Sequence, residues 1–146
     1  MNIARRGAIL IFMFGVILGG GCAVTQLNSV VTPNVNLSNF KEIYVVHLDA
    51  DGRGIDKLIA TRLAAMGYKV SNGPEASIPK DPDAIVTYQD KWMWDITMYM
   101  IELNIQIRDP KTNIAVASGH SLRTSLARKS PEEMVEEVLT KIFNRS

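Results

Sequence analysis

The acidic residues that follow the first apolar run of the folded region have part of the spacing of a calcium loop. Residues 49–54 read Asp-Ala-Asp-Gly-Arg-Gly, with carboxylates at the first and third loop positions and a glycine at the sixth. The fifth position is Arg53, and the twelfth, where a bidentate glutamate belongs, is Ala60. The pattern is also typical of phosphotransferase nucleophiles, but the domain is too short for their other motifs. We interpret the segment as a turn whose acidic side chains lie at the positive end of a helix, and predict no metal site.

The two histidines, His47 and His120, are the candidates for acid–base chemistry. A histidine titrates near neutral pH and becomes a general base when a carboxylate orients its ring. Ser118, Ser121 and Asp95 could complete a hydrolytic triad with His120, but no Gly-x-Ser-x-Gly elbow accompanies them. We interpret both histidines as half-buried, hydrogen-bonded side chains, and predict no catalytic residue and no cofactor. A small hydrolase that uses one histidine with a nearby carboxylate is the alternative.

Three methionines are candidates for a surface that binds a protein partner. In the expected strand over residues 84–94, Met93 lies on the face opposite the two tryptophans, which we expect to pack in the core. Met98 and Met100 lie on the same face as Met93 in the next strand, by the same alternation. Methionine side chains are unbranched and polarisable, which suits a surface that adapts to a partner. We therefore predict that Met93, Met98 and Met100 contact a partner.

Hydrophobic periodicity predicts the elements that position these residues, in the order β-α-β-β-β-β-α. They lie, in chain order, at residues 43–48, 55–66, 68–70, 84–94, 98–108, 114–122 and 130–143. The first two strands should be parallel, joined by a right-handed crossover through the first helix. The third and fourth should form a hairpin that turns at residues 95–97, since 26 strand-like residues from Asp83 to Arg108 are too long for one strand in a small domain.

The expected fold is a two-layer α/β sandwich of the α+β type, with a mostly antiparallel sheet and both helices on one face. The second helix begins with Ser130-Pro-Glu-Glu133, a capping box with proline at the first helical position. Its apolar stripe should pack on the sheet face that bears Ile101, Leu103 and Ile105. The stripe consists of Val135, Val138, Leu139 and Ile142.

The first 22 residues have the composition of an export signal. Arg5 and Arg6 precede an uncharged apolar run over residues 8–18, which three glycines and Cys22 follow. A transmembrane anchor is the competing interpretation, but the run is shorter than the roughly 20 residues that span a bilayer. We therefore expect a cleaved signal peptide.

The segment Leu18-Gly-Gly-Gly-Cys22 resembles the lipobox of bacterial lipoproteins. The resemblance implies that Cys22 carries acyl chains and is the first residue of the mature chain. Ala23, in place of an aspartate, implies the outer membrane rather than the inner one. We expect a signal peptide over residues 1–21, a lipidated tether over 22–39 and an α/β globular domain over 40–146, on the periplasmic face of the membrane.

Charge and cysteine content exclude several classes of protein. The 146 residues include 16 Lys and Arg against 15 Asp and Glu, which gives no electrostatic reason for nucleic-acid binding. A single cysteine excludes an internal disulfide framework and any site built from several cysteines.

Residues 83–143 look like a group of small proteobacterial lipoproteins of uncharacterised function. Their layout is also similar to the α/β domains of periplasmic assembly lipoproteins, including those of curli secretion and penicillin-binding-protein activation. The resemblance implies a binding or assembly role in the cell envelope and supplies no catalytic residues. We predict a lipid-anchored protein with an envelope protein as its partner, and keep a small envelope hydrolase as the alternative.

Overall fold

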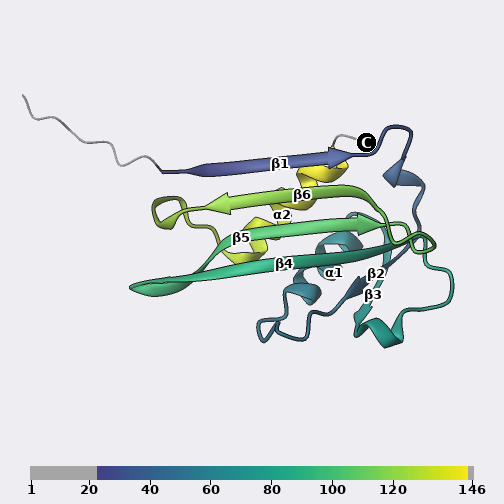
Figure 1. Ribbon diagram of the computed structural model, residues 1–146, viewed down its shortest axis with the longest axis horizontal. Helices are drawn as coiled ribbons and strands as arrows, with labels where there is room; N and C mark the ends of the chain where they lie inside the picture. Colours follow the sequence, from purple (N-terminus) through teal and green to yellow (C-terminus); the bar gives the residue numbers. More distant parts are fainter. Residues whose placement is uncertain (1–22, 145–146) are drawn as a thin grey trace, which may run out of the picture.

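A six-stranded mixed sheet with two helices on one face forms the structure, a computed structural model that describes residues 23–144 (Figure 1). Its strands and helices are β1 (Thr25–Val31), β2 (Glu42–Val46), α1 (Ile55–Ala65), β3 (Lys69–Gly73), β4 (Ala84–Asp95), β5 (Thr97–Arg108), β6 (Ala115–Arg123) and α2 (Pro131–Phe143). Three single 3-10 turns are η1 (Leu37–Asn39), η2 (Glu75–Ser77) and η3 (Ser125–Ala127). The predicted fold class is confirmed. The predicted signal peptide and Cys22 lie outside the described residues.

The strand order β1-β6-β5-β4-β2-β3 combines an antiparallel part with a parallel part. β1, β6, β5 and β4 are antiparallel neighbours, and β2 is parallel to both β4 and β3. The parallel β2–β3 pair joined through α1 and the β4–β5 hairpin are both confirmed. Within residues 23–144, no helix is long and apolar enough to span a membrane.

The prediction that residues 22–39 form a tether is wrong for Thr25–Val31. These residues form the edge strand β1, which pairs with β6 from Thr25 opposite Arg123 to Val31 opposite Ala117. Leu27 and Val31 pack against the core, and between them the buried hydroxyl of Ser29 donates to the carbonyl oxygen of Lys141 at 2.9 Å. The inward row of β1 therefore has a serine at its centre, which interrupts the apolar alternation that reveals a strand.

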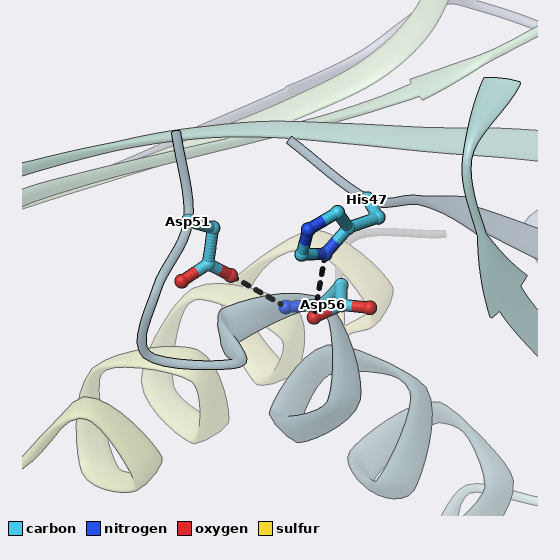
Figure 2. A group of neighbouring side chains, drawn as sticks. All are labelled: His47, Asp51 and Asp56. Atoms are coloured by element: carbon cyan, nitrogen blue, oxygen red, sulfur yellow. Dashed lines mark hydrogen bonds and ion pairs between the residues drawn. The ribbon is translucent and has the colours of Figure 1, made fainter. Parts of the chain in front are cut away.

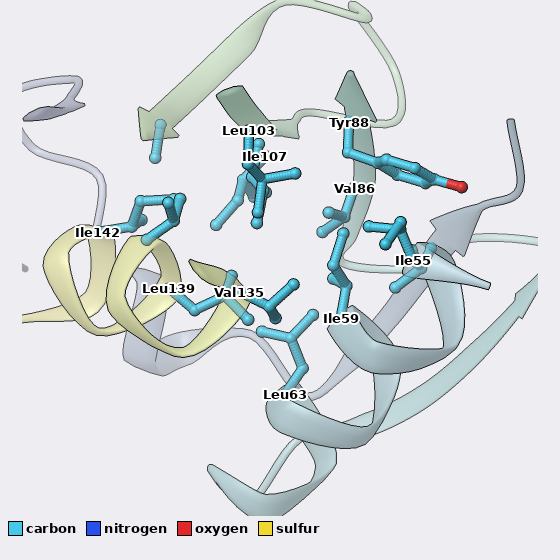
Figure 3. Close-up of a cluster of buried hydrophobic side chains, with 14 of the residues drawn as sticks. Ile55, Ile59, Leu63, Val86, Tyr88, Leu103, Ile107, Val135, Leu139 and Ile142 are labelled. Atoms are coloured by element: carbon cyan, nitrogen blue, oxygen red, sulfur yellow. The ribbon is translucent and has the colours of Figure 1, made fainter. Parts of the chain in front are cut away.

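The hydrophobic core lies between the helices and the covered face of the sheet (Figure 3). The predicted stripe of α2 is confirmed, since Val135, Val138, Leu139 and Ile142 are all at most 1% exposed. The predicted capping box is also present at Ser130. The stripe lies close to β6 at Gly119, where an added Cβ would come within 2.8 Å of Val138 Cγ1 and Ile142 Cγ1.

A bulge in β5 reverses the alternation expected near its start. Lys91 lies opposite Glu102, but Trp92 lies opposite Met100, so Ile101 is the extra residue. Met100 therefore enters the core and is 1% exposed, whereas Ile101 is half-buried. The prediction that Met100 lies on the uncovered face is wrong, and so is the prediction that Ile101 lies fully in the core.

The turn of the β4–β5 hairpin lies at residues 95–97, as predicted. Asp95 pairs with Thr97, and Ile96 between them has a left-handed φ of 63° and is 85% exposed. The two tryptophans near this turn differ in exposure. Trp92 packs at the edge of the core, but Trp94 is 68% exposed, so the prediction of a core position is wrong for Trp94.

Candidate functional site

Asp51 organises the loop that precedes α1. The first backbone N–H groups of a helix need acceptors, and the residue at the N-cap position is Gly54, which has no side chain to supply one. The Asp51 carboxylate takes that role: Oδ1 accepts from the N–H of Arg53 at 2.7 Å and of Gly54 at 2.9 Å, and Oδ2 accepts from the N–H of Ile55 at 2.6 Å. The Tyr88 hydroxyl also donates to Oδ2, at 2.7 Å. The interpretation of this segment as a turn at the positive end of a helix is confirmed.

These hydrogen bonds decide the charge state of Asp51. Burial raises the pKa of Asp51, but the hydrogen bond from Tyr88 and those from the backbone of Arg53 and Ile55 together outweigh burial, so the pKa lies below its usual value. Burial raises the pKa of the Tyr88 hydroxyl, which therefore remains a donor. Asp51 is an ionised carboxylate whose lone pairs are occupied by the fold.

His47 and Asp56 meet beside this loop (Figure 2). Asp56, in the first turn of α1, is 2% exposed, and its Oδ2 accepts from the Asn72 side chain at 2.6 Å. Its Oδ1 lies 3.3 Å from Nδ1 of His47, which follows β2. The crossover from β2 to α1 brings the two residues together. This arrangement supplies a base and an orienting carboxylate, two of the three groups of a hydrolytic triad.

His47, Asp51 and Asp56 together are the metal-binding candidate among the described residues. One ligand atom each from His47, Asp51 and Asp56 lies within 4.8 Å of the others. Both oxygens of Asp51, however, already accept two short hydrogen bonds each, and a cation would have to displace them. His47 and Asp56 alone offer fewer than the three protein ligands of an ordinary zinc site. We assign no metal to this cluster.

His120 lies on the opposite face of the sheet, the face without helices. Its Nε2 is 3.2 Å from Oε1 of Glu102. The same Oε1 accepts from the Asn104 side chain at 3.1 Å, and Oε2 of Glu102 accepts from Lys91 at 2.7 Å. The hydrogen bonds from Lys91 and Asn104 lower the pKa of Glu102. Both histidines are half-buried, as predicted. His120 lies within hydrogen-bonding distance of Glu102, and His47 forms an ion-pair contact with Asp56.

The structure does not assemble the triad considered from the sequence. Ser121 is fully buried on the helix side of β6 and donates to Glu137 at 2.5 Å. Asp95 lies at the tip of the β4–β5 hairpin, where Arg128 binds it. Of that set, only Ser118 and His120 share a face, two positions apart on β6.

The helix-free face is hollowed, and polar and apolar side chains together line the hollows. A groove of about 650 Å³ crosses β2, β4 and β5, and a second hollow of about 450 Å³ continues over β6 and β1. Amide and hydroxyl side chains line both. They include Asn28, Thr87, Gln89, Asn104, Gln106 and Ser118. Arg108 crosses the groove, donating to the Gln106 side chain at 2.6 Å and the Asn113 carbonyl at 2.7 Å. Such a surface offers neutral donors and acceptors beside apolar side chains such as Ile78 and Ile85.

Exposed apolar side chains gather at one end of the sheet, which we call the apolar end. It consists of Met93, Trp94, Ile96, Met98 and Leu126, which are 48%, 68%, 85%, 46% and 72% exposed. The first four lie on the β4–β5 hairpin tip and Leu126 lies on η3. Two of the three predicted partner-binding methionines are thus exposed here. Met98 lies opposite Trp94 in the sheet and shares its face, so the prediction that Met98 lies on the same face as Met93 is wrong. Trp94, Ile96 and Leu126 were not among the predicted partner-binding residues. Ile96, an apolar residue in the predicted turn at residues 95–97, was the sequence feature that indicates an exposed apolar surface there.

Comparison with known proteins establishes the fold alone. No protein-family model matches the chain, and no curated protein matches its sequence. Among solved structures, a PelC dodecamer from Paraburkholderia phytofirmans is similar at 13% identity with a TM-score of 0.56, covering 81% of this chain and 94% of that one. A DUF4136 family protein from Bacteroides thetaiotaomicron is similar at 12% identity with a TM-score of 0.51, covering 83% of this chain and 95% of the other. The chain therefore has an α+β sandwich fold that occurs in both of these proteins.

Proposed function

We propose that the chain is a lipid-anchored protein of the cell envelope whose sheet domain binds or assembles with another envelope component. The observation that carries the proposal is the apolar run that ends in Gly-Gly-Gly-Cys22, directly before a folded domain. The resemblance to bacterial lipoproteins supports the anchor, and Ala23 favours the periplasmic face of the outer membrane. The dodecamer formed by PelC supports an assembly role for a domain of this fold.

The groove of the helix-free face is the surface that we assign to the partner. The groove is wide, and most of its side chains are neutral, with Glu75 and Arg108 as the charged members of its lining. A protein partner with exposed backbone or amide groups would satisfy these donors and acceptors. The role is therefore binding, with no reaction assigned to the groove.

Mass spectrometry of the membrane-extracted protein tests the anchor. The mature chain should begin at Cys22 and carry acyl chains, and Cys22→Ser should release the protein from membranes or leave its signal uncleaved. Ala23→Ser is the matched control, since it changes the neighbouring residue and should retain the lipid. An unmodified Cys22 thiol in the wild-type chain would contradict the proposal.

Photocrosslinking in intact cells tests the binding surface. A crosslinking amino acid at Gln106, within the groove, should give discrete adducts with another envelope protein. The same amino acid at Thr61, which is exposed on α1, is the control and should give none. Equal adducts at both positions, or none at Gln106, would contradict the assignment of the groove.

The alternative of a small envelope hydrolase draws on one observation, the His47–Asp56 contact at 3.3 Å. His47 is 34% exposed, so the ring reaches solvent while the carboxylate behind it is buried. If the chain is a hydrolase of this kind, an activity-based probe for nucleophilic hydrolases should label the wild-type protein and fail to label His47→Gln. Equal labelling of both, or none, rejects this alternative.

A further inference from the structure

We infer that the apolar end of the domain inserts into the interface of the bilayer that holds its anchor, so that the domain lies against the membrane. The inference rests on the proposed lipid at Cys22 and assigns a specific surface to the membrane. The surface consists of the β4–β5 hairpin tip and η3, which lie at the same end of the sheet as the start of β1 (Figure 1).

The proposed anchor is close to the apolar end along the chain. The carbonyl oxygen of Val24 accepts from the backbone N–H of Thr124 at 3.3 Å and from its hydroxyl at 3.2 Å. Val24 is thereby fixed to the residue that precedes η3 and Leu126. Two residues of extended chain span at most about 7 Å, so Cys22 cannot lie further than that from Val24. A lipid on Cys22 therefore brings this end of the domain to the membrane surface.

The two parts of the apolar end are bound to each other. Arg128, directly after η3, donates to the Asp95 carbonyl at 2.9 Å and to the Thr97 hydroxyl at 2.8 Å. Its guanidinium also lies 4.4 Å from the centre of the Tyr99 ring. The β4–β5 hairpin tip and η3 therefore form one surface, so Trp94, Ile96 and Leu126 are presented together.

The exposed side chains of the apolar end are of types that favour a membrane interface. Tryptophan is enriched where membrane meets water, because its ring is apolar and its N–H is polar. Isoleucine and leucine gain from leaving water, and Ile96 and Leu126 have no other cover within the described chain. The basic groups nearby are already paired, Arg128 with Asp95 and Lys129 with Glu137. The membrane contact should therefore be mainly apolar and only weakly dependent on salt.

A bilayer explains this surface better than a protein partner does. Met93 and Met98 remain from the predicted partner-binding surface, and both lie on the same hairpin tip as Trp94. With the anchor within about 7 Å of Val24, the bilayer is the apolar phase nearest to them.

Tryptophan fluorescence of the full-length lipidated protein in vesicles tests the inference, because the chain has only Trp92 and Trp94. The vesicles contain phosphatidylethanolamine and phosphatidylglycerol, with or without brominated acyl chains that quench tryptophan at the membrane. In the Trp92→Phe variant, the remaining Trp94 should be quenched by brominated lipid at least about twice as strongly as Trp92 is in the Trp94→Phe variant. Trp92 is a matched control because Arg53 covers its ring at 4.0 Å.

The outcomes separate this inference from the proposed anchor. Lipidated protein that floats with the vesicles but shows no quenching of Trp94 overturns the inference and leaves the anchor intact. If Trp94 in native membranes is shielded from both brominated lipid and aqueous acrylamide, a protein covers it and the inference is wrong. If Cys22 carries no lipid, the anchor proposal fails, and unlipidated Cys22→Ser protein mixed with the same vesicles decides the inference: quenching of Trp94 supports it and its absence overturns it.

Discussion

Asp51 shows how one side chain can serve folding while having the appearance of a ligand. Its position in an Asp-x-Asp-Gly pattern suggests calcium, but its oxygens accept backbone N–H groups at the start of α1. Ala60, at the twelfth position of the loop pattern where calcium needs a bidentate glutamate, already disfavours calcium binding from the sequence alone. The partnership with Tyr88 was beyond sequence reasoning, because the two residues lie on separate elements 37 positions apart.

Asp51→Asn should lower the free energy of unfolding by about 1–3 kcal/mol at pH 7, since it weakens several charge-assisted hydrogen bonds. The pKa of Asp51 is depressed by folding, so its contribution is complete above the unfolded-state pKa and is lost as pH falls through the folded-state value. The difference between wild type and variant should therefore shrink below about pH 4. Urea unfolding at pH 7 and at pH 3 measures both quantities.

Asp49→Asn is the control for this prediction. Asp49 is exposed in the same turn, and its replacement should change stability by less than about 0.5 kcal/mol at either pH. An equal loss in both variants would mean that general charge, and not the capping role of Asp51, stabilises the loop.

Ile96 adopts a backbone conformation that β-branched residues avoid, with φ of 63° at the hairpin tip. Ile96→Gly should therefore raise the melting temperature, by relief of roughly 1 kcal/mol of strain. The same variant should weaken quenching of Trp94 by brominated lipid if the apolar end inserts into the bilayer. Thermal unfolding followed by circular dichroism tests the first effect, and a lower melting temperature would contradict it.

The elements follow from periodicity wherever each strand or helix has one consistent apolar row. Both the apolar stripe and the capping box of α2 were predicted, because the periodicity of the stripe and the residue types of the first turn indicate a helix independently. The residue range of β5 was predicted, but the face on which its first side chains lie was not. One extra residue at the bulge moves Met100 into the core. No local sequence pattern predicts that bulge.

At the scale of a helix on the sheet, Leu139→Ala should lower the free energy of unfolding by about 2–5 kcal/mol. Leu139 is fully buried between α2 and the sheet. Leu126→Ala makes the same change at a residue that is 72% exposed, and should cost less than about 0.5 kcal/mol. Denaturant unfolding of the two variants side by side measures the contrast.

Gly119→Ala tests the close approach of α2 to β6. The added Cβ would lie 2.8 Å from carbons of Val138 and Ile142, so the helix or its side chains must shift, and we expect a loss of about 1–3 kcal/mol. At Gly52, nothing lies within 4 Å of an added Cβ, and Gly52→Ala is the matched control. Similar stabilities of the two variants would show that α2 has room to move.

The folded domain begins at β1, earlier in the chain than hydrophobic periodicity predicts. The apolar end forms only when the complete sheet brings the β4–β5 hairpin tip and η3 together. β1 is part of the sheet even though its inward row contains Ser29. The hairpin tip and η3 are about thirty residues apart in sequence, and Arg128 joins them only after β6 has returned to the same end. The groove likewise requires β4 and β5 beside β2. Sequence reasoning therefore found candidate residues singly but not the surfaces that they form.

A pair of variants in β1 decides where the domain begins. Leu27→Ser removes a side chain that packs against the core and should cost about 1–3 kcal/mol. Val30→Ser changes an outward residue that is 67% exposed and should cost less than about 0.5 kcal/mol. Thermal or denaturant unfolding distinguishes them. In a flexible tether, both changes would be neutral.

The pairing of β1 with β6 also has a consequence in time. The first strand to leave the ribosome has the sixth strand as its neighbour, so almost the whole domain must be synthesised before β1 has a partner. Contacts between such distant parts of a chain form slowly, because a long loop must close before they contribute. Until then, β6 presents an open edge of unpaired backbone groups. Such an edge can pair with a strand of another partly folded chain and so promotes aggregation. We expect the closing of this edge to be the last step of folding.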